Sequence, residues 1–119
     1  MNRIVWFDVP VNDLGRAVQF YSQVLDVEIK EEFPGVAVMT HQDSEVAGCL
    51  FKSDEQRPSR DGIMVYFNVN GRIREAVKAV ESHQGELVQD VHAIGPFGFR
   101  AIVVDSEGNR IVLHSETDA

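Results

Sequence analysis

The chain carries one pattern of hydrophobic and polar positions twice. In the first copy, residues 4–11 alternate between two faces, with Val5, Phe7 and Val9 on one side and Trp6, Asp8 and Pro10 on the other, which is the period of a half-buried strand. Residues 14–25 then place apolar side chains at the spacing of an amphipathic helix, which Asn12 or Asp13 can cap. Three more strand-like runs complete this copy, at residues 27–33, 36–41 and 47–52.

The second copy follows a polar linker at residues 53–62. Its first strand covers residues 63–69, Asn70 can cap a second helix, and Gly85 can close that helix. Three more strands are expected at residues 86–94, 99–104 and 110–115. Because the two copies are displaced by about half the chain, we interpret them as duplicated units that pack on one another.

This repeated order predicts an α+β fold of two βαβββ modules. They form a single domain, residues 1–119, with module 1 at about 1–57 and module 2 at about 62–119. Each module has one helix to cover one face of its four strands, so the opposite face needs another partner. Packing the modules with those faces inward gives a half-barrel cleft, where we expect the function to lie.

Composition and charge narrow the classes of partner. The formal net charge is −8, so we expect neither nucleic acid nor an anionic membrane as a partner. No apolar run approaches the roughly 18 residues that span a bilayer, and the N-terminus turns acidic before a signal-peptide core can form, so the expected location is cytoplasmic. The single cysteine, Cys49, excludes an intrachain disulfide and is expected to be a small buried residue.

Side chains out of phase with the apolar core positions should line the cleft. They form an aromatic and apolar wall with a few polar groups, the usual makeup of a small-molecule pocket. Aromatic rings can stack on a flat ligand, while amide and phenol groups can orient its polar edge. The expected lining residues are Trp6 and Asp8 from the first strand, Met64, Tyr66 and Asn68 from the fifth, and Arg110, Val112 and His114 from the last.

Asp8 and His114 are the candidates for catalysis, because both are polar and both have the inward parity. A carboxylate beside an imidazole raises the pKa of the histidine and can create a general acid or base. Two other roles remain open for this pair. The residues can bind a ligand, or they can satisfy each other as a buried structural pair.

A loop at residues 92–100 adds two more ligand-binding candidates. Phe97 could act as a lid over the cleft, because the neighbouring glycines permit a mobile backbone, and Arg100 could pair with an anionic ligand. The alternatives are an ordinary turn with a core anchor for Phe97 and a surface ion pair for Arg100.

Two segments of the chain resemble the opening and closing signatures of the vicinal oxygen chelate superfamily. The first is Val9-Pro10-Val11-Asn12-Asp13-Leu14 with Arg16-Ala17 and Phe20-Tyr21, and the second is Asp105-Ser106-Glu107-Gly108-Asn109-Arg110. This superfamily groups glyoxalase I, bleomycin-resistance proteins, fosfomycin-resistance enzymes and extradiol dioxygenases. The resemblance covers essentially the whole chain. It implies paired βαβββ modules, a homodimer and a small-molecule site in the sheet cavity.

The resemblance also implies a divalent metal in the enzymatic members, held by His, Gln or Glu side chains. Here the corresponding positions fall on Trp6, Met64 and Val112, and the remaining position lies within residues 47–51, which are Ala, Gly, Cys, Leu and Phe. None of these is a good oxygen or nitrogen donor for a hard cation. We therefore expect no metal ligands and no cofactor.

The leading hypothesis is a metal-free glyoxalase or bleomycin-resistance-like protein that binds a small aromatic or amphipathic molecule between the modules. One alternative is a glyoxalase-type lyase or isomerase that uses Asp8 and His114, with a weakly held divalent metal. Another is a dimeric interaction module whose cleft is vestigial. Because proteins that share a fold can have different activities, the sequence leaves open whether the protein is an enzyme.

Overall fold

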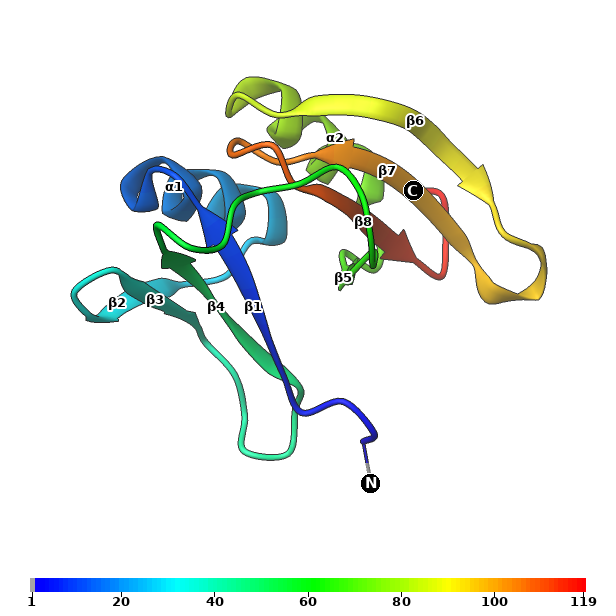
Figure 1. Ribbon diagram of the computed structural model, residues 1–119. Coiled ribbons are helices and arrows are strands. Elements are labelled where there is room, and N and C mark those ends of the chain that lie inside the picture. Colours follow the sequence, from blue (N-terminus) through cyan, green and yellow to red (C-terminus); the bar gives the residue numbers. More distant parts are fainter. Residues whose placement is uncertain (1) are drawn as a thin grey trace.

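The computed structural model describes residues 2–119, which form two four-stranded sheets with one helix each (Figure 1). Module 1 contains β1 (Trp6–Val11), α1 (Leu14–Leu25), β2 (Ile29–Phe33), β3 (Val36–Met39) and β4 (Ala47–Lys52). Module 2 contains β5 (Tyr66–Asn68), α2 (Ile73–Ser82), β6 (Glu86–Ala93), the short 3-10 helix η1 (Gly95–Phe97), β7 (Phe99–Val104) and β8 (Arg110–Ser115). The predicted α+β fold of two βαβββ modules is confirmed, and the two sheets do not close into a barrel.

The two sheets repeat the same topology. Their strand orders are β1-β4-β3-β2 and β5-β8-β7-β6, and the first and fourth strands of each module pair in parallel. One face of each sheet is covered by its helix, and we call the other face the open face. In module 1, Trp6, Asp8 and Pro10 of β1 share the open face with Ala47, Cys49 and Phe51 of β4, which are their register partners.

Strand boundaries differ from the prediction mainly where a strand lacks a neighbour. Strand β5 covers Tyr66–Asn68 rather than residues 63–69. Val5, which the alternation placed on the core side, is 72% exposed. The reason is that β4 begins at Ala47, opposite Trp6, so no strand runs beside the residues that precede Trp6.

Helix α1 begins as its sequence predicts. Asp13 is the N-cap, and its Oδ1 accepts the backbone N–H of Arg16 at 3.0 Å. The helix ends at Leu25, and Asp26 follows in the left-handed conformation, with φ 55°. No helix in the described part of the chain is long and apolar enough to cross a bilayer.

Helix α2 lacks the predicted cap. Its N-cap residue is Arg72, which makes no side-chain cap hydrogen bond. Asn70 instead accepts the backbone N–H of Glu116 through Oδ1, at 2.7 Å, and so holds the end of the chain. The helix ends before Gly85, where an added Cβ would lie 2.6 Å from the Phe20 ring, so this glycine permits α1 and α2 to approach closely.

A single hydrophobic core joins the two modules. It consists of the helix-covered sheet faces together with α1 and α2, which pack on each other. Phe67 of β5 crosses the boundary, since its ring centroid lies 5.5 Å from that of Phe7 and 5.6 Å from that of Tyr21. The modules therefore meet through their helix-covered faces rather than through their open faces, which corrects the packing inferred from the sequence.

The loop of residues 105–109, between β7 and β8, locks module 2 onto module 1. Asp105 is buried, and its carboxylate accepts hydrogen bonds from the Tyr21 hydroxyl, the backbone N–H groups of Glu107 and Asn109, and the Asn109 amide. Asn109 also donates to the Pro10 carbonyl at 2.8 Å. The pKa of Tyr21 is raised well above its ordinary value, first by burial and then by the Asp105 charge.

Glu107 of the same loop holds the start of α1. Its Oε1 accepts the backbone N–H groups of Asn12 and Asp13, and its carboxylate pairs with the Arg16 guanidinium at 2.7 Å. Burial alone would raise the pKa of Glu107, but the hydrogen bonds, led by that from Arg16, outweigh burial and lower it. The loop that carries the closing signature therefore binds the segment that carries the opening signature.

Candidate functional site

A pocket of about 330 Å³ lies where the modules meet, and we call it the seam pocket. Its wall combines apolar side chains with a few polar groups from both modules. Module 1 contributes Phe7, Leu25, Val27, Met39, Thr40, His41, Glu45, Val46, Ala47 and Gly48, and module 2 contributes Tyr66, Phe67 and Asn68. Gly48 is needed here, because a Cβ at that position would overlap the Phe7 ring.

A second hollow of about 250 Å³ adjoins the seam pocket. Tyr66, Phe67 and Asn68 line both, and the second hollow also contacts His114 and Glu116. Strand β5 is therefore the wall between them. Of the residues predicted to line a cleft, Tyr66, Asn68 and His114 are brought together here.

The open face of module 1 is centred on the carboxylate of Asp8. Its Oδ1 accepts the Trp6 indole N–H at 2.7 Å and the Cys49 thiol at 3.2 Å. Burial, followed by the hydrogen bond to Asp8, raises the pKa of Cys49 to about 11. Cys49 is buried, as predicted, and its thiol stays protonated at neutral pH. The Trp6 ring is 44% exposed and meets His41 edge to face, with 6.3 Å between the ring centroids.

The open face of module 2 is centred on the guanidinium of Arg100. Arg100 lies on β7, between His92 of β6 and His114 of β8 in the sheet register. Its Nη1 donates to the Tyr66 hydroxyl at 2.6 Å, and its Nε donates to His92 Nε2 at 3.0 Å. His114 Nε2 is 2.6 Å from the Phe97 carbonyl and donates to it. The Tyr66 ring is 45% exposed.

The remaining predicted site residues are dispersed. Asp8 helps to line a third hollow, of about 200 Å³, together with Arg110 at the other end of the seam. Met64 is half-buried, Val112 is fully buried, and Phe97 is an exposed residue of η1. Asp8 and His114 do not pair, because Asp8 bonds to Trp6 and Cys49 while His114 bonds to Phe97.

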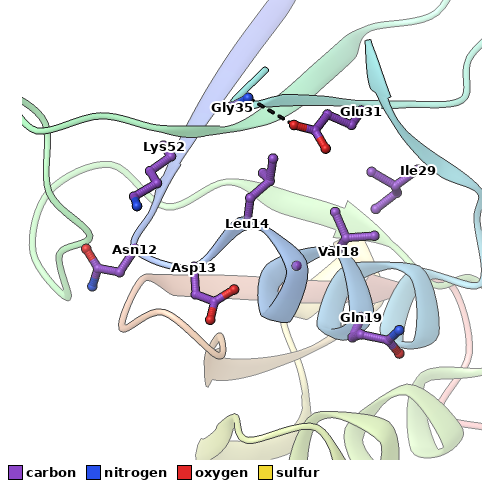
Figure 2. A pocket seen from close by; sticks show the side chains of 10 residues that line it. Asn12, Asp13, Leu14, Val18, Gln19, Ile29, Glu31, Gly35 and Lys52 are labelled. Carbon is purple, nitrogen blue, oxygen red and sulfur yellow. Dashed lines mark hydrogen bonds between the residues drawn. The ribbon is translucent and has the colours of Figure 1, made fainter. Parts of the chain in front are cut away.

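A larger hollow, of about 730 Å³, lies on the helix side of module 1 (Figure 2). We call it the helix-side groove. Its apolar surface comes from Leu14, Val18 and Ile29, with no aromatic ring. Its two carboxylates are already committed, since Asp13 accepts the Arg16 N–H and Glu31 accepts the Gly35 N–H at 3.0 Å. The groove is therefore built from capping and turn contacts, and sequence parity did not predict it.

The residues present do not fit the divalent metal that the resemblance implies. Trp6, Met64 and Val112 stand at the expected positions, and an indole, a thioether and an isopropyl group offer no ligand to a hard cation. Among residues 2–119, no three His, Cys, Asp or Glu side chains gather closely enough to hold a metal ion.

The fold, the paired modules and the 105–109 loop together match one known family. The model of the Glyoxalase/Bleomycin resistance protein/Dioxygenase superfamily matches residues 3–113. The chain belongs to this superfamily. A search among curated proteins gave no match.

Several solved structures share the fold at low sequence identity. A glyoxalase/bleomycin resistance protein from Albidiferax ferrireducens matches with a TM-score of 0.78 and 14% identity, over 96% of this chain and 98% of that one. A hypothetical protein from S. aureus matches with a TM-score of 0.74 and 20% identity, over 97% and 94%. The fosfomycin resistance protein FosX from Listeria monocytogenes matches with a TM-score of 0.71 and 13% identity, over 97% and 93%.

Sequence parity missed two histidines of the site. His92 bonds to Arg100, and His41 lines the seam pocket beside Trp6. His92 stands at the start of the 92–100 loop, where the sequence analysis assigned ligand-binding roles to Phe97 and Arg100 alone. His41 lies in the loop after β3, where no periodic signal applies.

Proposed function

We propose that this protein binds a small aromatic or amphipathic molecule at the seam between its modules, without a divalent metal. The observation that carries the proposal is the seam pocket itself, to which both modules contribute. Its volume of about 330 Å³ lies at the lower end of the range of small-molecule sites. The superfamily assignment supports a small-molecule role but does not specify the ligand.

The wall of the pocket offers the groups that such a ligand needs. The exposed Tyr66 ring supplies a flat face for stacking, and Phe7, Phe67 and Met39 supply apolar surface. Asn68 uses Oδ1 to accept the Asn70 N–H at 2.9 Å, which fixes its side chain and leaves the amide NH₂ to donate to a ligand.

Catalysis by Asp8 and His114 has less support than binding, because each side chain is hydrogen-bonded elsewhere. Homodimerisation and a cytoplasmic location remain predictions. Sedimentation equilibrium of the purified protein tests the first directly.

Binding of 2-naphthamide, a neutral flat probe, tests the proposal. We expect saturable binding to the wild type and about a tenfold loss in Tyr66→Ala, which removes the stacking face. Phe33→Ala is the matched control, since Phe33 is an exposed ring (64%) on β2 that does not line the seam pocket. Absence of saturable binding, or equal binding by Tyr66→Ala and the wild type, would reject the proposed site.

Metal content tests the second part of the proposal. We expect far less than one zinc, nickel, manganese or iron ion per chain in protein that is purified without a histidine tag. About one tightly held ion per chain would show that the side chains present do provide ligands and would overturn the metal-free assignment.

A further inference from the structure

Arg100 is a cation without an anionic partner in a strongly acidic protein. The chain has 19 Asp and Glu residues against 11 Lys and Arg residues, and Arg100 is one of the eight cations that form no ion pair with the described residues. The ion pairs of the described residues join Arg16 to Glu107, Lys30 to Glu28 and Arg60 to Glu86, and none involves Arg100.

Neutral acceptors hold the Arg100 guanidinium in place. His92 Nδ1 is 2.8 Å from the Asp90 carbonyl and donates to it, so His92 Nε2 presents a lone pair, which accepts the Arg100 Nε–H. The Tyr66 oxygen accepts from Nη1. These contacts orient the guanidinium without neutralising it, which is how a pre-organised anion site differs from a structural ion pair.

Arg100 and Tyr66 both keep donors available for a ligand. Both N–H groups of Nη2 are free of hydrogen bonds to the described residues, and the Tyr66 O–H can donate because its oxygen already accepts. His114 lies opposite Arg100 in the register, and its ring is tilted against that of Tyr66 with 6.3 Å between centroids. A planar guanidinium thus lies beside two flat rings.

The nearest acids do not neutralise this site. The Asp90 carboxylate accepts the backbone N–H of Val91 at 2.7 Å, and Glu116 lines the 250 Å³ hollow with Tyr66 and His114. Neither carboxylate forms an ion pair with Arg100.

We infer that Arg100 and Tyr66 bind the carboxylate of a small aryl carboxylic acid whose ring lies against Tyr66 and His114. The planar fork of arginine matches a carboxylate in a bidentate arrangement, and the Tyr66 hydroxyl adds a third donor. This inference rests on the proposed function, because it names the chemical class of the ligand for the site that shares Tyr66 with the seam pocket.

Paired probes of equal shape test this inference. The dissociation constants of 2-naphthoate and 2-naphthamide are measured for the wild type, Arg100→Gln, Tyr66→Phe and the control Arg74→Gln, which removes an exposed arginine from α2. We expect the wild type to prefer the carboxylate by about tenfold, which is the gain from charge-assisted hydrogen bonds. Arg100→Gln should abolish the preference, Tyr66→Phe should reduce it, and Arg74→Gln should retain it.

Two different outcomes would contradict the carboxylate site, and they can be told apart. Equal binding of both probes, with no effect of Arg100→Gln, would overturn the carboxylate site while the proposed function stands. Failure of both probes to bind the folded wild type would overturn both proposals. A thermal unfolding transition like that of the wild type would show that Arg100→Gln and Tyr66→Phe fold.

Discussion

The two modules have the same order of strands, yet the loops between their third and fourth strands are built differently. In module 2 the 105–109 loop is buried and bonds to β1 and α1 through Asp105, Glu107 and Asn109. In module 1 the equivalent loop, residues 40–46, is exposed, and Glu45 accepts only the Gln42 N–H within its own turn. The duplication therefore keeps the topology, while one copy alone supplies the lock between modules.

The open faces of the two modules also differ, in the charged group at their centre and in its hydrogen bonds. In module 1 the Asp8 carboxylate is occupied by donors from Trp6 and Cys49. In module 2 the Arg100 guanidinium is held by neutral acceptors and keeps donors free. The first face is centred on a carboxylate that accepts through Oδ1, and the second on a guanidinium that keeps N–H groups for an anion, so a shared backbone does not give the two faces a shared chemistry.

The comparison of the loops predicts the largest effect. Asp105→Ala removes the acceptor of several buried hydrogen bonds, so we expect a loss of about 4 kcal/mol in the free energy of unfolding. Glu45→Ala in the equivalent loop should change it by about 0.5 kcal/mol or less. Urea unfolding at pH 7 measures both. Equal losses would show that the two loops contribute alike.

The burial of Glu107 allows a second test of how strongly the 105–109 loop stabilises the fold. The pairs Arg16–Glu107 and Arg60–Glu86 have the same N···O distance of 2.7 Å, but the Glu107 side chain is fully buried and that of Glu86 is 57% exposed. We expect Glu107→Gln to cost about 2 kcal/mol at pH 7 and Glu86→Gln about 0.5 kcal/mol or less.

The effect of Glu107 should also depend on pH. Because the pKa of Glu107 is lowered in the folded state, its stabilisation is present above the ordinary value of 4.5 and is lost as the pH falls through the folded pKa. The difference between the wild type and Glu107→Gln should therefore shrink in acid. A difference that stays constant from pH 7 to pH 3 would contradict this account.

Trp6 should matter little for stability. Its ring is 44% exposed on the open face of module 1, so Trp6→Ala is expected to cost about 1 kcal/mol, well below the 3–5 kcal/mol of a core tryptophan. Thermal and urea unfolding measure this loss. A loss in the core range would mark Trp6 as part of the core and would contradict its exposed position on the open face.

Asp8→Asn is expected to change the reactivity of Cys49. The Asp8 carboxylate contributes to the raised pKa of about 11, so removing its charge should lower that pKa and speed alkylation by iodoacetamide at pH 8. An unchanged alkylation rate would mean that burial alone controls the thiol.

Much of the fold could be predicted because the two periodicities are clean. Strands β4, β7 and β8 have the predicted boundaries, since each is flanked by neighbours and by turn residues. The packing of the modules could not be predicted in the same way, because alternation defines two faces of a strand but not which face meets the other module. The contacts of Phe67 with Phe7 and Tyr21, which only the structure shows, identify the helix-covered faces as the ones that meet.

The site was predictable only in part. Parity placed Tyr66, Asn68 and His114 together, because β5 and β8 are regular and pair in parallel. Parity could not predict that Asp8 bonds to Trp6 rather than to His114. Asp8 and His114 lie in different sheets, and parity does not place one sheet relative to the other. Parity also gave no role to His92, because alternation does not predict the side-chain hydrogen bond by which His92 orients Arg100.

The central claim is that ligands bind at the seam and the adjoining open face of module 2, and not in the larger helix-side groove. Chemical-shift mapping of ¹⁵N-labelled protein during titration with 2-naphthoate tests it most directly. The account predicts that the largest shifts fall on the amides of Tyr66, Phe67, Asn68 and His114 and on the Arg100 Nε–H. Shifts concentrated at Leu14, Val18 and Ile29 would place the site in the helix-side groove of Figure 2 and would contradict the account.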